Sequence, residues 1–322
     1  MDRHLSTDMR NPLVTIALPV FNGEDFLAQA VECLLKQDYV HFELILLDNC
    51  STDATERICR SFCEQDRRIR YFRHSRNLGA LANFNSAIRF AQGDFFMYSA
   101  HDDLWEPDFL KELLPLLLHD ETLGLAFSGL DFVDENGRAS ECKELPPRLC
   151  GAHSHFLNFL HYSVRFDYDY IVYGLYRTEA LKQTLPFQTV GGGLRYSTAL
   201  FLFRLLTLAK AAGSRKVLFH YRVRSRASDL NDDNRFRWLL NYGRSLLYFY
   251  PLLCGTIRDS SFSFLQKLLL CLVCFVVIGF RFLLLAVVNI LPRTRRRRIK
   301  DSLRRTLAKA SSLLPAKRRG EG

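Results

Sequence analysis

The chain has 322 residues, of which 48% are hydrophobic, so it is long enough to bury a sizeable core in one or two domains. Its formal net charge is +10, but residues 293–322 alone hold 12 Lys or Arg against 2 Asp or Glu, so residues 1–292 are neutral on balance. A folded nucleic-acid-binding face would spread basic residues over the domain, and we therefore expect no nucleic-acid partner.

Short apolar runs alternate with amphipathic stretches along the first 130 residues, as in strands that alternate with helices. The expected strands are 13–18, 43–47, 69–73, 94–99 and 123–128. The expected helices are 24–37, 54–64, 80–92 (capped by Gly93) and about 107–118. Further along, we expect a hairpin turn over 130–137 and a strand over 216–219. The predicted fold class is α/β, a mostly parallel twisted sheet with flanking helices.

Polar residues follow three of the expected strands. These clusters are residues 19–23 (PVFNG), Asp48-Asn49 and His101-Asp102-Asp103. In open α/β sheets, ligands bind beyond the carboxyl ends of the strands, so the clusters predict a ligand site at that edge. No G-x-G-x-x-G follows the first strand, which argues against a dinucleotide-binding fold of the usual type.

The pair Asp102-Asp103 is the centre of the expected chemistry. Two adjacent carboxylates repel each other unless a cation or a donor compensates them, and a divalent metal is a natural partner. Such a metal would bridge the pyrophosphate of a nucleotide and stabilise charge on a departing diphosphate. The alternative is structural: Asp103 could cap a helix that begins near Pro107.

A series of motifs in order from Val14 to about Leu118 resembles the nucleotide-binding half of the family 2 glycosyltransferases, which have the GT-A fold. The motifs are residues 18–23 (LPVFNG), 42–53 (FELILLDNCSTD), 76–79 (RNLG) with Asn83, 93–96 (GDFF), 100–103 (AHDD), Trp105 and Pro107. The combination of DNxSTD with AHDD is similar to a branch found among bacterial surface-polysaccharide enzymes.

The resemblance implies a nucleotide-sugar donor, foremost a UDP-sugar, and transfer with inversion. The residues implied to contact or shape the donor site are Pro19, Phe21, Glu24, Asp48, Asn49, Asn77, Gly79, Asn83 and Asp102. Phe21 would stack on the base, which Asp48 or Asn49 would also contact. Glu24 would lie near the diphosphate, Asp102 would face the ribose or donor sugar, and Asp103 would ligate Mn²⁺ or Mg²⁺. As alternatives, Phe21 could be a core aromatic and Glu24 an acid favoured by a helix dipole.

An inverting transferase also needs a base that deprotonates the acceptor hydroxyl. The resemblance places an acid within residues 191–199, yet none occurs there or anywhere between Glu179 and Asp229. The open candidates are Asp167, Asp169, Glu179, Asp229, Asp232 and Asp233, of which we take Asp169 as the predicted catalytic residue. Arg222 or Arg224 could hold the diphosphate, or form a solvated basic strand end. The missing acid leaves a non-catalytic nucleotide-sugar-binding homologue as the alternative function.

Residues 268–291 are almost continuously apolar, broken by Gly279, Arg281 and Asn289. One helix of that length spans about 36 Å, enough to cross a bilayer. Arg281 near its middle, and the basic residues 293–300 after it, favour a re-entrant or interfacial arrangement instead. We expect residues 235–250 and 300–322 to contribute interfacial helices, with the basic residues attracted to anionic lipids.

Three parts of the chain are therefore predicted. They are a nucleotide-sugar-binding half (1–130), an acceptor-binding half (131–234) and membrane-associated helices (235–322). Nine cysteines without metal-ligand spacing, and no cleavable N-terminal signal, indicate reduced thiols in a cytoplasmic setting. We expect a metal-dependent transferase that acts on a lipid-linked or polysaccharide acceptor at the cytoplasmic face of the cell membrane. A membrane-anchored scaffold would leave the polar strand ends unexplained.

Overall fold

A computed structural model of the protein describes residues 11–143, 154–164, 169–190, 194–223 and 249–276. The strands are β1 (Val14–Val20), β2 (Phe42–Asp48), β3 (Ile69–Arg73), β4 (Phe95–Tyr98), β5 (Leu104–Trp105), β6 (Leu123–Val133), β7 (Ala139–Lys143), β8 (Leu175–Arg177) and β9 (Lys210–Arg222). The helices are α1 (Leu27–Leu35), α2 (Thr55–Gln65), α3 (Ala80–Ala87), α4 (Phe109–His119), α5 (His155–Val164), α6 (Thr178–Thr184) and α7 (Leu194–Leu208). Short 3₁₀ helices are η1 (Ile88–Phe90) and η3 (Asp169–Tyr173). Residues 249–259 and 264–276 are also helical.

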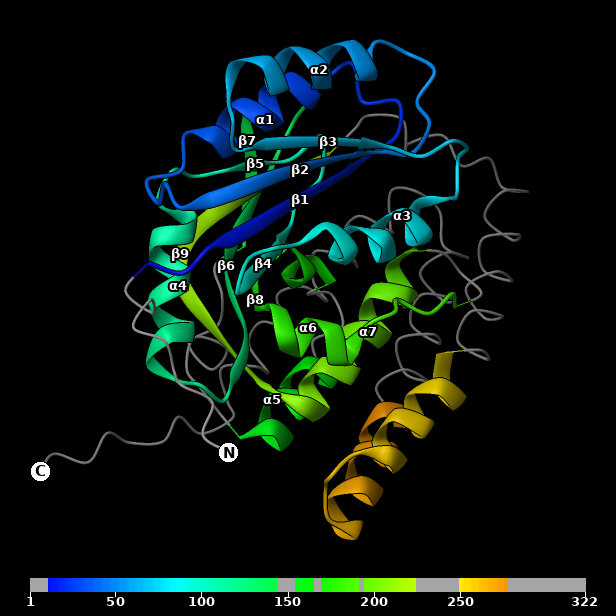
Figure 1. The fold of residues 1–322 in the computed structure, drawn as a ribbon. Helices are drawn as coiled ribbons and strands as arrows, with labels where there is room; N and C mark the ends of the chain where they lie inside the picture. Colours follow the sequence, from blue (N-terminus) through cyan, green and yellow to red (C-terminus); the bar gives the residue numbers. More distant parts are fainter. Residues whose placement is uncertain (1–10, 144–153, 165–168, 191–193, 224–248, 277–322) are drawn as a thin grey trace, which may run out of the picture.

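The first four long strands form the parallel part of one nine-stranded sheet, in the order β3-β2-β1-β4. Every residue of β1 and β2 is buried, because α1 and α2 cover one face of these strands and α3 covers the other (Figure 1). Strands buried on both faces read as continuous apolar runs, which is how the sequence presents them. The predicted α/β class, with a parallel twisted sheet and flanking helices, is confirmed.

Beyond β4 the sheet becomes mixed. Strand β8 pairs antiparallel with β4 and with β6, and β9 lies parallel to β6 on the other side. Strand β5 then pairs antiparallel with β9, with Leu104 opposite His220. This pairing brings the end of β9 beside the segment that follows β4.

Several element boundaries differ from the predicted ones. Helix α1 begins at Leu27 rather than residue 24, and residues 24–26 form a turn in which the Phe26 and Leu27 amides donate to the Gly23 carbonyl. The fifth predicted strand continues to Val133, so the hairpin turn lies at 134–138, where the Asp134 amide donates to the Arg138 carbonyl. The predicted strand 216–219 lies inside the 13-residue β9.

Gly93 does not cap a helix, which corrects the sequence prediction. Helix α3 ends at Ala87 and η1 at Phe90, before Gly93 is reached. A Cβ on Gly93 would lie 2.6 Å from both the Leu13 carbonyl oxygen and the Thr15 amide nitrogen. A side chain is therefore excluded there by the close approach of the chain to the start of β1.

Most of the predicted membrane region lies outside the described residues. This includes residues 235–248, 277–291 and 293–322. Within the ranges that the structure describes, no helix combines the length and apolar character needed to cross a membrane. The membrane-associated helices therefore stay a prediction.

Candidate active site

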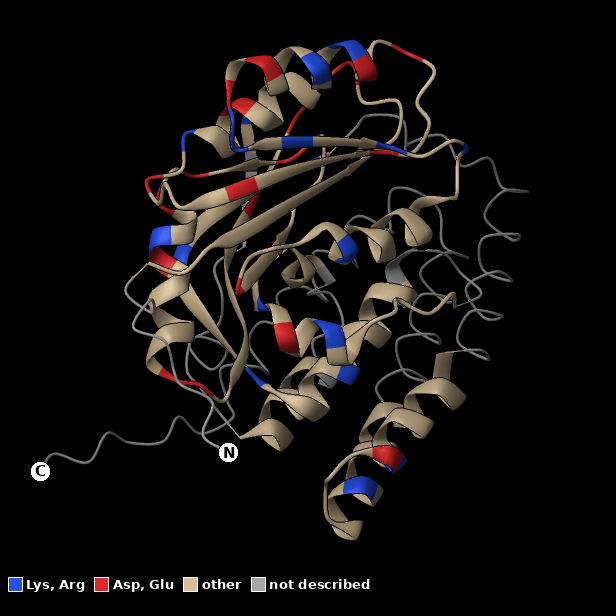
Figure 2. Ribbon diagram, in the orientation of Figure 1, with Lys and Arg blue, Asp and Glu red and all other residues tan. Residues whose placement is uncertain are grey.

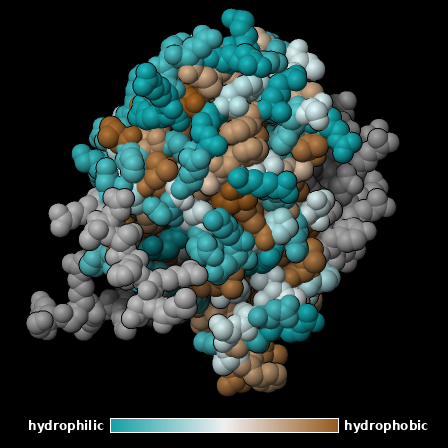
Figure 3. Space-filling view, viewed as in Figure 1, coloured by the Kyte–Doolittle hydropathy of each residue, from teal (hydrophilic) through white to brown (hydrophobic). Residues whose placement is uncertain are grey.

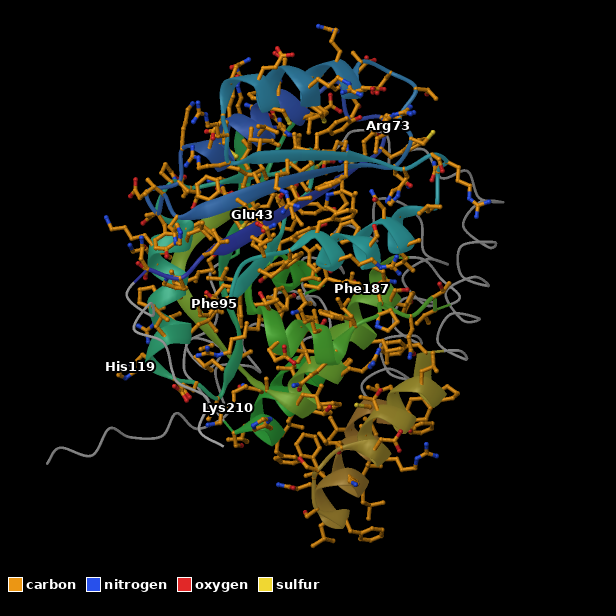
Figure 4. The ribbon with its side chains drawn as sticks, viewed as in Figure 1. Glu43, Arg73, Phe95, His119, Phe187 and Lys210 are labelled. Carbon is orange, nitrogen blue, oxygen red and sulfur yellow. The ribbon has the colours of Figure 1, made fainter. Side chains whose placement is uncertain are left out.

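The carboxyl ends of β2, β1 and β4 lie side by side. Strands β2 and β3 lie on one side of β1, whereas β4 lies on its other side, so the strand order reverses between β1 and β4. Such a switch point is where α/β sheets bind ligands. Figure 4 shows Arg73, the last residue of β3, at this edge, with Glu43 and Phe95 towards the other end of their strands. A Cβ on Gly23 would lie 2.9 Å from Cδ2 of His101, so the loops after β1 and β4 pack directly together.

Asp48 closes β2 as a buried, fully engaged carboxylate with 0% exposure. Its Oδ1 accepts the Ser51 amide (2.8 Å), and its Oδ2 accepts the Tyr71 hydroxyl (2.9 Å) and Nε of Arg73 (3.1 Å). Burial and the hydrogen bond to Asp48 raise the pKa of Tyr71 well above its ordinary value, so this hydroxyl stays a donor. Asp48 thus fixes the loop that follows β2.

The neighbouring asparagines hold a second loop against the end of β2. Nδ2 of Asn49 donates to Oδ1 of Asn77 (2.8 Å), which also accepts the Gly79 amide (2.8 Å). Gly79 has φ of +83°, a left-handed conformation that suits glycine, and α3 begins at the next residue. Nδ2 of the buried Asn83 donates to the Leu47 carbonyl (3.2 Å). Asn49, Asn77, Gly79 and Asn83 therefore all shape this edge of the sheet. Contact of Asp48 or Asn49 with a base stays a prediction.

The loop after β1 combines strain with an exposed aromatic ring. Pro19 is buried in the strand, whereas Phe21 is 41% exposed and is therefore not a core aromatic. Asn22 (φ +50°) and Cys50 (φ +64°) both adopt left-handed backbone in adjacent loops, and Oδ1 of Asn22 accepts the Thr52 amide (2.9 Å). Strained residues of this kind cluster at ligand sites. The ring of Phe21 is thus available for stacking at the switch point.

Glu24 lies in the turn before α1 and interacts with a different helix. Its Oε2 accepts the amide of Ala54, the residue before α2 (2.9 Å), while the Glu24 amide donates to Oδ2 of Asp53 (3.0 Å). An acid at a helix N-terminus is favourable, so the structural alternative applies, but to α2 instead of α1. Contact of Glu24 with a diphosphate stays a prediction.

Asp102 and Asp103 occupy different environments. Asp103 is 2% exposed and its Oδ1 accepts the Arg222 amide at 2.8 Å, whereas the Asp102 side chain is 22% exposed. Asp103 does not cap a helix: β5 intervenes, and α4 has Asp108 at its N-cap. The helix-cap alternative is therefore wrong for Asp103.

The aspartate pair suits a cation that also binds phosphate. Over the part of the chain that the structure describes, no group of three or more His, Cys, Asp or Glu side chains could hold a metal ion. Mg²⁺ characteristically takes one or two protein carboxylates and completes its shell with waters and substrate phosphates. Two adjacent carboxylates match that donor set in type, and metal binding by Asp103 stays a prediction.

Arg222 is a buried residue that holds this loop, which the sequence did not reveal. Its Nε donates to the Asp102 carbonyl (2.6 Å), Nη1 to the Glu135 carbonyl (2.7 Å) and Nη2 to Oε1 of Gln29 (2.6 Å). The guanidinium also lies 4.6 Å from the centre of the Phe26 ring, and the residue is 3% exposed. The alternative of a solvated strand end is therefore wrong for Arg222. Its side-chain nitrogens Nε, Nη1 and Nη2 already donate hydrogen bonds within the protein, which argues against a role of Arg222 in binding the diphosphate. Arg224 lies outside the described residues.

A histidine between two carboxylates braces the same region. Nε2 of His220 lies 2.8 Å from Oε1 of Glu106, and Nδ1 lies 2.5 Å from Oδ1 of Asp131. The three residues come from β9, the segment after β5, and β6, so they fasten β5 and the aspartates before it to the sheet. No local sequence signal links residues so far apart.

The direction of β8 separates the candidate bases. Met97 pairs with Leu175 and Phe95 with Arg177, so η3, which precedes β8, lies at the carboxyl edge of β4. Glu179 follows β8 and lies at the opposite edge, where the Thr178 amide donates to the Asp94 carbonyl (3.0 Å). Asp169 begins η3, at the same edge as the aspartate pair. Asp167, Asp229, Asp232 and Asp233 lie outside the described residues.

Comparison with known proteins gives a consistent family assignment. The family model described as Glycosyl transferase family 2 matches residues 15–185, just over half of the chain. TuaG of Bacillus subtilis, named for teichuronic acid biosynthesis, is 31% identical over 126 residues, which are 39% of this chain and 50% of TuaG. WcaA of Escherichia coli, named for colanic acid biosynthesis, is 36% identical over 104 residues, 32% of this chain and 37% of WcaA. The matches thus span half or less of these relatives.

Solved structures agree on the fold. S. aureus TarS 1–349 in complex with UDP-GlcNAc has a TM-score of 0.60 at 17% identity, over 80% of this chain and 70% of that one. The mannosyltransferase PcManGT of Pyrobaculum calidifontis, in complex with GDP-Man and Mn²⁺, has a TM-score of 0.51 at 16% identity, over 88% of each chain. At these identities the likeness shows a shared GT-A-like α/β fold.

Proposed function

The chain belongs to glycosyl transferase family 2, and on that premise we propose that it transfers a sugar from a nucleotide sugar, with inversion, to a lipid-linked or polysaccharide acceptor. The observation that carries the proposal is the meeting, at one sheet edge, of the exposed Phe21 with the aspartate pair and η3. An exposed ring suits a base, and adjacent carboxylates suit a metal-bound diphosphate.

The donor is proposed to be a nucleoside diphosphate sugar, with a UDP-sugar first. The similar structures carry UDP-GlcNAc in one case and GDP-Man with Mn²⁺ in the other, which supports the donor class and allows either base. In this chain the loops fixed by Asp48 and Asn49 flank Phe21, so they would select the base.

In the proposed reaction Asp103 would hold Mn²⁺ or Mg²⁺ while Asp102 faces the ribose or donor sugar, and the metal would supply positive charge for the departing diphosphate. The Asp169 carboxylate takes the proton of the acceptor hydroxyl while that oxygen bonds to the anomeric carbon. The bond from this carbon to the β-phosphate oxygen breaks, and its electron pair leaves with the nucleoside diphosphate. Attack opposite the leaving group inverts the configuration.

The location proposed for this reaction is the cytoplasmic face of the cell membrane, the inner membrane in a Gram-negative cell. Two features support it: the apolar residues 268–291 and the net +10 of residues 293–322. TuaG and WcaA, to which the chain is similar, are named for teichuronic acid and colanic acid biosynthesis. Anionic lipids are the proposed membrane partner.

The reaction is tested by nucleoside diphosphate release. We expect full-length protein in detergent, given Mn²⁺, a panel of UDP-, GDP- and TDP-sugars and a lipid-linked acceptor extract, to release one diphosphate and to stop when EDTA removes the metal. Readdition of Mn²⁺ should restore release. Donor binding in calorimetry without release under any acceptor would favour the non-catalytic homologue, and absence of binding to every donor would contradict both.

Exchange of Asp169 tests the base. We expect Asp169→Asn to lower kcat by roughly 10²- to 10⁴-fold, the usual contribution of a general base, while the donor Kd stays within about twofold. Glu179→Gln is the matched control, because Glu179 lies at the opposite sheet edge, and it should keep kcat within about twofold. The reverse ranking of the two variants would remove Asp169 from the mechanism.

A further inference from the structure

Two helices near the end of the described chain, residues 249–259 and 264–276, pack on the body beside α5 and α7 (Figure 1). Phe249, Leu253 and Ile257 are all 0% exposed, and their spacing of four places them on one side of the first helix. The Phe249 ring lies 5.7 Å from that of Tyr196, and the Phe262 ring lies 5.8 Å from that of Phe159. The pair is thus anchored to the folded core.

The second helix is apolar both on the side that packs on the body and on the side that faces away from it. Its inner side is formed by Leu270 (0% exposed) and Cys274 (1%), and its Cys271 carbonyl accepts the Tyr250 hydroxyl at 3.2 Å. The outer side carries Phe264 (80% exposed), Leu265 (73%), Leu268 (59%), Leu269 (44%), Leu272 (59%), Phe275 (64%) and Val276 (55%). These seven residues are called the outer face. Figure 3 shows hydrophobic surface at the foot of the molecule, where the pair projects.

A helix that faces water on its outer side would carry polar residues there, because that side gains nothing from exposure of apolar carbon. The charges of residues 249–276 are limited to Arg258, Asp259 and Lys267, and Figure 2 shows the pair mostly in the tan of uncharged residues. Nε of Arg258 contacts Oδ1 of Asp259 (2.8 Å), and Nζ of Lys267 donates to the Arg258 carbonyl (2.8 Å). The second helix therefore has no acidic residue, and its single charged residue is Lys267, whose Nζ is held by the first helix.

We propose that the outer face docks into an anionic lipid bilayer, with Phe264, Leu268 and Leu272 in the boundary between headgroups and acyl chains. Two features of the chain select this occupant. Residues 277–291, which follow the second helix in the chain, are mostly apolar and are broken by Gly279, Arg281 and Asn289, so the sequence next to the outer face is largely lipid-compatible. The net +10 of residues 293–322 is complementary to anionic headgroups and repels a second copy of the chain.

The proposal places the membrane contact on a rigid part of the fold. The helix pair 249–259 and 264–276 is fixed to α5 and α7 through aromatic contacts, so docking would set the orientation of the catalytic domain on the lipid surface. Basic residues alone would tether the chain without orienting it. This inference rests on the membrane location proposed above, but it is tested separately from the proposed reaction, since vesicle binding requires neither donor nor metal.

The test is sedimentation of the full chain with vesicles of equal phosphatidylglycerol and phosphatidylcholine in 0.5 M NaCl, which screens the basic residues. We expect Leu268→Gln/Leu272→Gln to lower the partition coefficient at least tenfold, because two apolar side chains leave the lipid. Val40→Gln/Leu208→Gln is the matched control, at residues 68% and 49% exposed elsewhere, and should stay within about twofold. Phe264→Trp, in the wild-type background, should be quenched by lipids brominated on their acyl chains.

Three outcomes would overturn the proposal. Wild-type binding by the Leu268/Leu272 variant would remove the outer face from the membrane contact. A wild-type dimer that the variant converts to monomer, with vesicle binding unchanged, would assign the face to a second copy. Absence of bromolipid quenching of the tryptophan at position 264 would assign the membrane contact to another part of the chain. Loss of vesicle binding with unchanged diphosphate release in detergent would leave the proposed reaction intact.

Discussion

Asp103→Asn is expected to lower sugar transfer by roughly 10³-fold while leaving the fold intact. A metal held by this carboxylate contributes several kcal/mol of charge stabilisation to the departing diphosphate, and about 4 kcal/mol corresponds to that factor. Asparagine is nearly isosteric and keeps the oxygen that accepts the Arg222 amide at 2.8 Å. The exchange therefore removes the charge and preserves the buried hydrogen bond.

The measurements are kcat at saturating donor, the apparent Mn²⁺ affinity and the melting temperature. We expect a melting temperature close to that of the wild type, because neither volume nor the amide contact changes. Asp38→Asn serves as the control, since Asp38 is half-exposed before β2 and faces Lys111 at 3.8 Å. Wild-type kcat and metal response in Asp103→Asn would exclude Asp103 as a metal ligand and would leave Asp102 as the remaining carboxylate to test.

The parallel half of the fold could be predicted because its signals are local. The run 69–73 became β3 without a change of boundary, and α3 begins at Ala80 as expected, after the turn at Gly79. β1 and β2, which are buried on both faces, are apolar at most positions, and this makes them visible in the sequence without knowledge of their neighbours. The polar residues after β1, β2 and β4 then meet at one edge as a consequence of parallel pairing.

The remainder depends on partners that are distant in sequence. The first half of β9, which includes Gly213, Ser214 and Arg215, lacks a strand pattern and becomes a strand because it pairs with β6. Arg222 binds Gln29, which is 193 residues away, and His220 joins residues 89 and 114 positions away. No periodicity encodes such contacts.

The separation of Asp169 from Glu179 has the same origin. These residues are only ten positions apart, yet they occupy opposite edges because β8 runs antiparallel to β4. The sequence shows the acids and the short strand between them, but the direction of a three-residue strand is set by its neighbours in the sheet. The candidate base could therefore be named from sequence, while the reason to prefer it could not.

Arg222→Met is expected to lower the free energy of unfolding by about 1–3 kcal/mol, the cost of removing the partner of a buried polar group. Methionine keeps much of the apolar stem but donates no hydrogen bond. The carbonyls of Asp102 and Glu135, and Oε1 of Gln29, would each lose a donor. Arg222 itself is 3% exposed, whereas Gln29 and Glu135 are exposed, so water can replace part of the lost hydrogen bonding. Denaturant unfolding gives the energy, with Arg60→Met as the control, because Arg60 forms an exposed pair with Glu56 at 2.7 Å.

The same variant should weaken catalysis through the aspartate pair, in the fraction that stays folded. Arg222 fixes Asp102 by its side chain and Asp103 by its amide, and methionine retains the second contact but not the first. We therefore expect a higher Mn²⁺ requirement together with a lower kcat, and partial rescue of both by Arg222→Lys, whose ammonium can reach one of the carbonyls. A purely structural arginine would lower the melting temperature without moving the metal titration. Because the two readouts separate stability from positioning, they decide whether the end of β9 is part of the active site or only of the sheet.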